Sequence, residues 1–215
     1  VCLYWIFWIL FKRYNIFIYI SYNGNVNINI IDYKTQYIVY ENKIKCVLQE
    51  DNIESFALGC NWDVSVKIKV KWSPGLYIIS LNKDAFYLPL VILSTKPSNC
   101  VINMNTNTWC AYNSWGGASF YRNNLNIDSK FTNDKVSYCV SYLRPNIDIS
   151  DDIKFVLSES WKKNYYKSHI IAGELYLIDW MIKYHIDFDI ITDIEFERGN
   201  INNINNIIFN CHAEY

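Results

Sequence analysis

One segment, residues 63–71, alternates between polar and apolar side chains without interruption, and this period of two constrains the fold more than any other feature of the sequence. Val64, Val66, Ile68 and Val70 would share one face of a strand, and three lysines would cover the other. A strand with one buried and one hydrated face is typical of an antiparallel sheet. The segment therefore predicts a half-buried antiparallel strand.

More short strands are expected on both sides of this segment. Residues 25–30 alternate in the same way. Residues 73–75 (Ser-Pro-Gly) predict a turn, because proline fixes φ at its first corner and glycine accepts positive φ at the second. Further strands are expected at 76–81 and 86–93. Short strands joined by such turns predict a β-sandwich, and we assign residues 1–94 to a β-sandwich-like domain.

A different pattern follows a break at residues 96–99. Residues 173–185 place apolar side chains on one stripe, with Glu174 in the first turn and Lys183 near the end, which predicts a helix. Short, largely apolar strands are expected at 101–104, 188–192 and 207–210. Apolar strands combined with a helix are typical of a mainly parallel sheet covered on both faces. Residues 95–215 are therefore predicted to form an α/β domain.

The charge and the hydropathy of the chain argue against two classes of partner. The formal net charge is −1, which gives no overall attraction to nucleic acid or to an anionic membrane. The apolar run at residues 1–11 is about half as long as the ~20 residues that a membrane-spanning helix needs. We expect neither a nucleic-acid partner nor a membrane partner.

The cysteines and the chain ends bear on where the protein works and how much of it is present. The seven cysteines are scattered and contain no Cys-x-x-Cys pair, so neither a zinc ribbon nor a disulfide framework is predicted. Free thiols are typical of a reducing compartment, and a cytoplasmic location is favoured. The chain begins with Val1 in place of methionine and ends inside a motif at Tyr215, so we expect a fragment.

A loop is expected at residues 106–121, where the adjacent glycines Gly116 and Gly117 lie among tryptophans and tyrosines. Polar loops that are positioned by a scaffold often carry binding sites. An aromatic-rich loop packed under a sheet explains the same composition. Composition alone leaves both interpretations open.

Two further segments carry residues suited to chemistry. His212 and Glu214 follow the strand expected at 207–210, and in an extended chain their side chains would face the same way at its carboxyl end. Such a pair can bind a metal or combine a base with a metal ligand, and an ordinary surface pair is the alternative. Arg144 is held extended by Pro145, so its guanidinium could reach a site or lie on the surface.

Several short motifs occur in a fixed order over residues 55–215. The most specific are Ala111-Tyr112-Asn113 with Trp115-Gly116-Gly117, and His212-Ala213-Glu214-Tyr215 at the end. The other landmarks are Gly59-Cys60-Asn61-Trp62, Ser73-Pro74-Gly75-Leu76-Tyr77, Tyr87-Leu88-Pro89, Thr106-Asn107-Thr108-Trp109, Ser119-Phe120-Tyr121, Arg144-Pro145, Glu174-Leu175, Phe188-Asp189 and Thr192-Asp193. Together they resemble the N,N-dimethylformamidase large-subunit family.

The resemblance implies a fold and an iron centre. The fold would be an antiparallel β-sandwich followed by an α/β domain similar to class I glutamine amidotransferases, here incomplete. The family's mononuclear, ferric iron is bound by two tyrosines and one glutamate. On this chain the metal ligands would be Tyr112, Tyr121 and Glu214. Phenolate and carboxylate are hard oxygen ligands that suit ferric iron.

The resemblance also implies a reaction, the hydrolysis of a small amide of the formamide type by a metal-activated water. His212 would be the catalytic acid or base. Asn113, Trp115 and Arg144 are assigned to substrate binding. A small second subunit or a homo-oligomer is the expected protein partner.

Two departures from the family pattern keep other functions open. The family usually reads Gly-His-Asp-Glu-Tyr, whereas this chain has Cys211 and Ala213. Loss of the acid at 213 favours a non-catalytic relative that binds a carbohydrate or a protein. A third interpretation, with Cys211 as an amidotransferase nucleophile, needs a glycine-rich elbow that the sequence lacks. Because the expected remainder of the α/β domain does not follow Tyr215, the fragment is not expected to be active on its own.

Overall fold

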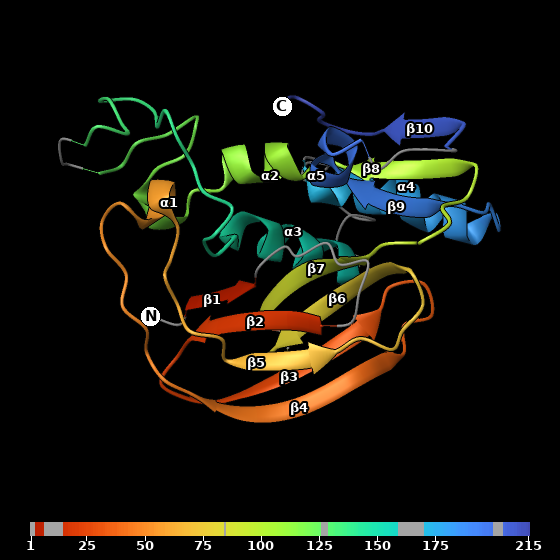
Figure 1. The fold of residues 1–215 in the computed structure, drawn as a ribbon, viewed down its shortest axis with the longest axis horizontal. Coiled ribbons are helices and arrows are strands. Elements are labelled where there is room, and N and C mark those ends of the chain that lie inside the picture. Colours follow the sequence, from red (N-terminus) through yellow and green to blue (C-terminus); the bar gives the residue numbers. More distant parts are fainter. Residues whose placement is uncertain (1–2, 7–14, 84, 126–128, 159–169, 200–203) are drawn as a thin grey trace.

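The structure is a computed structural model that describes residues 3–6, 15–83, 85–125, 129–158, 170–199 and 204–215. Two antiparallel sheets come first along the chain (Figure 1). One has the strand order β1-β2-β5, with β1 Leu3–Ile6, β2 Asn15–Ser21 and β5 Val66–Lys69. The other has the order β4-β3-β6-β7, with β4 Ile38–Cys46, β3 Gly24–Asp32, β6 Gly75–Leu81 and β7 Phe86–Ile92. The predicted antiparallel character of this part of the chain is confirmed.

The two antiparallel sheets enclose an isoleucine-rich core. Alternate residues of β2 and β3 point into it, as the period of two in their sequences requires. These core residues are Ile16, Ile18, Ile20, Val26, Ile28 and Ile30. Their full burial shows that the alternation in the sequence marks the inner faces of a sandwich.

The strand that the sequence predicts over residues 63–71 is shorter in the structure. Only Val66–Lys69 form β5, and Ile68 is buried in the sandwich core, whereas Val64 is 46% exposed. The side chain of Ser65 accepts the backbone N–H of Ile20 at 2.8 Å, in the place of a strand partner. The pairing of β5 with β2 therefore begins only after this residue.

The third sheet is parallel and has the order β10-β8-β9, with β8 Cys100–Met104, β9 Asp189–Thr192 and β10 Asn206–Phe209. Helix α4 (Ile171–Lys183) packs against it, close to the predicted 173–185. Helix α3 (Ile147–Leu157) lies between β7 and the parallel sheet (Figure 1). A mixed architecture of antiparallel sheets followed by a helix-covered parallel sheet is confirmed.

Strands β6 and β7 are buried on both faces. Tyr77 and Ile79 of β6 face the sandwich core, whereas Leu76 and Ile78 face the core formed with α3, α4 and the parallel sheet. This second core also includes Leu93 and residues beyond it, so it crosses the predicted division at residue 94. The division of the chain into 1–94 and 95–215 stays a prediction.

Residues 106–121, predicted as a loop, contain a helix, and the loop prediction is wrong for this half of the segment. Helix α2 spans Thr106–Tyr112, and a 3₁₀ turn, η1, spans Trp115–Gly117. Trp109, Cys110 and Ala111 are buried, but the surrounding Asn and Thr residues hide their helical spacing in the sequence. The remaining helices are short, α1 at Ser55–Leu58 and α5 at Asp193–Glu197. No helix in the described ranges is both long enough and apolar enough to cross a membrane.

Double burial of β6 predicts that two neighbouring residues are equally sensitive to truncation. Ile78→Ala and Ile79→Ala should each lower the free energy of unfolding by about 2–5 kcal/mol, because each leaves a cavity in a different core. Ile53→Ala, at an exposed loop position, is the control and should change it by less than about 0.5 kcal/mol. Urea denaturation measures all three. A control-like value for either core variant would contradict the double burial.

Candidate functional site

Parallel pairing of β8 with β10 brings two distant segments together. Both strands end at the same edge of the sheet; α2 follows β8, and residues 210–215 follow β10. The backbone N–H of Glu214 donates to Thr108 Oγ1 at 3.1 Å, which holds the C-terminal segment over α2. The last residue of α2, Tyr112, therefore lies beside His212 and Glu214.

Four side chains from these segments converge. The Tyr112 hydroxyl donates to Glu214 Oε2 at 3.2 Å and lies 3.2 Å from His212 Nε2. His212 Nε2 is also 3.0 Å from Glu214 Oε2. The Tyr121 ring lies against the Tyr112 ring, with centroids 4.2 Å apart, and its hydroxyl is hydrogen-bonded to Glu214 and to Tyr215 (2.7 Å). We call Tyr112, Tyr121, His212 and Glu214 the tyrosine cluster.

The hydrogen bonds of the tyrosine cluster fix which groups are ionised. Desolvation, followed by hydrogen bonding to Glu214, raises the pKa of Tyr121. Desolvation also raises the pKa of Tyr112, against the hydrogen bond from Tyr121, which lowers it. Hydrogen bonds from Tyr121 and then Tyr112, together with His212, lower the pKa of Glu214 against its desolvation. At neutral pH two neutral phenols therefore donate to one carboxylate.

A buried network anchors both halves of the tyrosine cluster to α4. Oε1 of Glu174, in the first turn of α4, accepts the backbone N–H of Asn105 and the indole N–H of Trp109, both at 3.1 Å. The Asn105 amide donates to the carbonyl of Asn210, and the Asn210 amide donates to the carbonyl of Gly173 at 3.1 Å. The start of α2 and the end of β10 are thus tied to the same helix end.

Glu174 is fully buried, and its Oε2 has no hydrogen-bond partner among the described residues. Burial raises its pKa well above the ordinary value, against the hydrogen bonds from Asn105 and Trp109, which lower it. A buried carboxylate oxygen without a partner is strongly disfavoured, so burial favours the protonated form of Glu174. Glu174 therefore positions α2 from a place where burial disfavours a negative charge.

The three residues predicted to bind substrate are buried, and their contacts stabilise the fold. Arg144 donates to the backbone carbonyls of Ser141, Trp115, Ala118 and Cys110 at 2.8–3.0 Å. Asn113 donates to the carbonyl of Pro145 at 2.7 Å and accepts the N–H of Trp115 at 3.2 Å. Trp115 packs with Cys60 and Trp62. These bonds fix the turn that follows Tyr112, and substrate binding by the three residues stays a prediction.

Cys211 links β10 to the tyrosine cluster. Its backbone adopts a left-handed conformation, with φ of 61°, which turns the chain back over α2. Partial desolvation raises the pKa of its thiol. A thiol held protonated in this way is a poor nucleophile, which argues against the amidotransferase-like interpretation.

Sequence reasoning gave no site role to three residues that support the tyrosine cluster, Asn105, Glu174 and Tyr215. A polar residue such as Glu174 on the buried stripe of a helix is the signal that could have found one of them. The described residues contain no group of three or more His, Cys, Asp and Glu side chains that could hold a metal. A metal centre at this edge of the sheet would therefore need the tyrosines.

Comparison with known proteins connects this edge of the sheet to one family. A family model described as N,N-dimethylformamidase beta subunit-like, C-terminal, matches residues 31–215. The matched region contains β4, β6 and β7 of the second antiparallel sheet, the whole parallel sheet and every residue of the tyrosine cluster. No curated protein matches the chain.

The raised pKa of Glu174 predicts a pH-dependent stability. An acid whose pKa is raised by folding stabilises the fold most at pH values below 4.5, its ordinary pKa, and loses this contribution as the pH rises above that value. Glu174→Gln keeps both accepted hydrogen bonds and does not ionise. Its melting temperature relative to wild type should therefore increase between pH 5 and pH 8, as measured by calorimetry.

A matched variant separates charge from hydrogen bonding. Glu174→Leu leaves the N–H groups of Asn105 and Trp109 without an acceptor, at about 1–3 kcal/mol for each group. It should be destabilised at every pH. Parallel pH profiles of wild type and Glu174→Gln would contradict a raised pKa of Glu174.

Proposed function

The chain belongs to the N,N-dimethylformamidase beta subunit-like, C-terminal family, and we propose that it forms an iron-dependent centre for the hydrolysis of a small amide of the formamide type. Tyr112, Tyr121 and Glu214 would hold the iron, and His212 would be the acid or base. The observation that carries the proposal is the meeting of two phenols on one carboxylate.

The donor set of the tyrosine cluster fits a ferric ion. Two phenol oxygens and a carboxylate oxygen are hard donors, and as anions they would carry three negative charges. Both phenol hydroxyls donate hydrogen bonds to Glu214, so the three oxygens already lie together. A cation bound between them would replace the two phenol protons. When bound, ferric iron supplies a Lewis acid for amide hydrolysis.

His212 is placed to move protons next to these donors. Its Nε2 lies 3.0 Å from Glu214 Oε2 and 3.2 Å from the Tyr112 hydroxyl, so two oxygens fix the direction of the ring nitrogen. About one third of its side chain surface is exposed (38%), which leaves room for a small substrate. An imidazole in this setting can accept a proton from attacking water and return it to the departing amine.

Ala213 replaces the aspartate of the usual family pattern. Other contacts hold the neighbouring residues in position. Glu214 is held through its backbone by Thr108, and Tyr215 is hydrogen-bonded to Tyr121 at 2.7 Å. These contacts fix the two residues that follow Ala213, without an acid at 213. The substitution is therefore compatible with an ordered site.

Two further proposals concern the fold and the partner of the chain. We propose that the parallel sheet is part of a glutamine amidotransferase-like α/β domain, and that a second subunit binds the chain, as the words beta subunit imply. A cytoplasmic location, proposed from the scattered cysteines, is compatible with the six described cysteines, which are all free.

Metal analysis tests the ligand set. The protein supplied with ferric iron should bind about one ion per chain and show a visible phenolate-to-iron absorption band. Glu214→Ala should lose the metal, and Tyr112→Phe or Tyr121→Phe should weaken both iron content and band. Tyr138→Phe, at an exposed position outside the tyrosine cluster, is the matched control. Iron binding by Glu214→Ala at the wild-type level would refute the ligand set, and no iron in wild type would favour a binding module.

Replacement of His212 separates chemistry from metal binding. His212→Gln in the full-length protein should keep the iron and its absorption band. Release of amine from small formamides should fall by about 10²–10⁴-fold, the usual contribution of a general acid or base. Wild-type turnover in this variant would show that another group moves the proton.

A further inference from the structure

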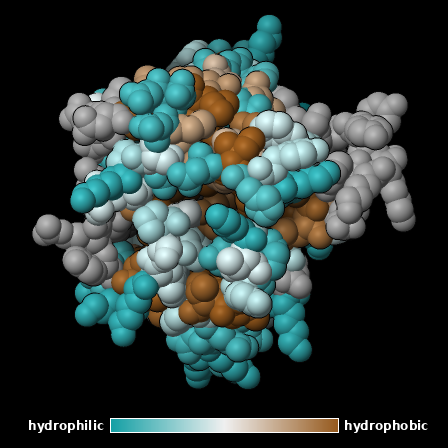
Figure 2. Space-filling model, turned by 90° about the vertical axis from the view of Figure 1, so that its right-hand side faces the viewer, coloured by the Kyte–Doolittle hydropathy of each residue, from teal (hydrophilic) through white to brown (hydrophobic). Residues whose placement is uncertain are grey.

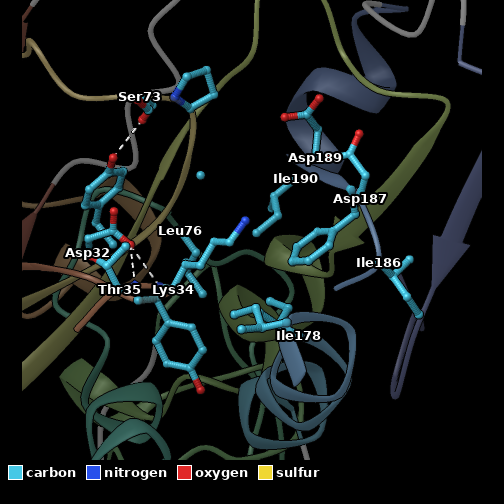
Figure 3. Close-up of a pocket in the computed structure, with 16 residues that line it drawn as sticks. Asp32, Lys34, Thr35, Ser73, Leu76, Ile178, Ile186, Asp187, Asp189 and Ile190 are labelled. Carbon is cyan, nitrogen blue, oxygen red and sulfur yellow. Dashed lines mark hydrogen bonds between the residues drawn. The ribbon is translucent and has the colours of Figure 1, made fainter. Parts of the chain in front are cut away.

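A pocket of about 360 Å³ lies at the other edge of the parallel sheet, away from the tyrosine cluster. Its walls are the β3–β4 turn at 32–35, the start of β6, the last turns of α4 and the chain that enters β9 (Figure 3). The volume is in the lower part of the range for small-molecule sites. Figure 2 shows this side of the molecule, where hydrophobic surface lies recessed between hydrophilic side chains.

The inner wall of the pocket is apolar and aromatic. Leu76, Ile178 and Ile190 are buried side chains that form its base. Tyr33 and Tyr77 are also part of the lining and are themselves largely buried. A ligand would therefore need an apolar body, and a cation on that body would gain from the aromatic rings.

The mouth of the pocket is acidic. Asp32, Asp187 and Asp189 line it together with one cation, Lys34; three carboxylates and one ammonium give a formal charge of −2. Asp32 Oδ1 accepts the backbone N–H groups of Lys34 (2.8 Å) and Thr35 (3.1 Å). Asp189 Oδ2 accepts the N–H of Ser98 at 2.5 Å. These bonds fix two of the three carboxylates in place.

Lys34 reaches from the turn across the pocket towards Ile190 and Asp189 (Figure 3). Its side chain is exposed, and among the described residues no carboxylate lies within ion-pair distance of its ammonium. An unpaired, flexible ammonium is readily displaced. Its displacement would leave the space beside the carboxylates open to a ligand cation.

We propose that this pocket is a binding site for a small organic ammonium ion with an apolar or aromatic body, which takes the place of the Lys34 side chain. The apolar base accommodates the body, and Asp187 and Asp189 bind the ammonium group. The net negative mouth disfavours carboxylates of the same shape. The proposal does not depend on the iron centre, because no residue of the tyrosine cluster lines the pocket.

Titration with benzylammonium tests the site, followed by calorimetry or by NMR shifts of the lining residues. Wild type should bind it with a Kd in the millimolar range or below, and phenylacetate, an anion with the same benzyl group, at least about tenfold more weakly. Lys34→Met should strengthen benzylammonium binding several-fold, because no internal ammonium competes. Asp187→Asn combined with Asp189→Asn should weaken it about tenfold or more.

Controls assign the binding to this pocket. Asparagine at 189 keeps an acceptor for Ser98, and equal melting temperatures would show that the double variant folds. Glu214→Gln should leave benzylammonium binding unchanged, whereas weaker binding in this variant would place the ligand at the tyrosine cluster. Preference for phenylacetate, or no binding to both wild type and Lys34→Met, would overturn the proposal.

Discussion

Burial of β6 and β7 on both faces is the constraint on which the rest of the structure depends. One face of these strands completes the isoleucine core of the sandwich, and the other supports α3, α4 and the parallel sheet. The two cores are therefore joined through one pair of strands and share its register. The parallel sheet that carries the site after β8 and β10 packs on this pair, and the pocket is lined by the start of β6.

The parallel sheet determines which side chains of the candidate site come together. Chain segments leave β8 and β10 at one edge, so Tyr112 and Glu214 meet although they are far apart in sequence. Glu174 makes this meeting rigid because it accepts bonds from Asn105 and Trp109 at the base of α2. Because burial favours its protonated form, Glu174 competes less with Glu214 for a cation. The order at the base of α2 therefore comes from a carboxyl group whose ionisation is disfavoured by burial.

The sequence predicted what depends on short-range pattern. The period of two in β3 and the apolar stripe of α4 both appear in the structure, because burial of one face leaves a direct trace in the chain. It did not predict α2, whose buried Trp109 is surrounded by Asn and Thr, or the late start of β5, which depends on a bond between Ser65 and Ile20. The predicted partners Tyr112, Tyr121, His212 and Glu214 do lie together. The sequence placed Glu174 in the first turn of a helix, but its anchoring role was not predicted, because its partners Asn105 and Trp109 are distant in sequence.

The hydrogen bonds that hold the side chains of the tyrosine cluster in place also bear on its proposed metal chemistry. Glu214 is a charged group whose partners are donors from Tyr112 and Tyr121, so the cluster is electrostatically satisfied with its protons in place. A metal ion would compete with these bonds, but it would meet donors that are already oriented and would not have to order three side chains. The raised pKa of each phenol makes that exchange a release of protons, so acid opposes metal binding. The site thus uses two carboxyl groups for different purposes. Glu174 holds α2 in place, and Glu214 accepts hydrogen bonds from the phenols whose protons a metal ion would displace.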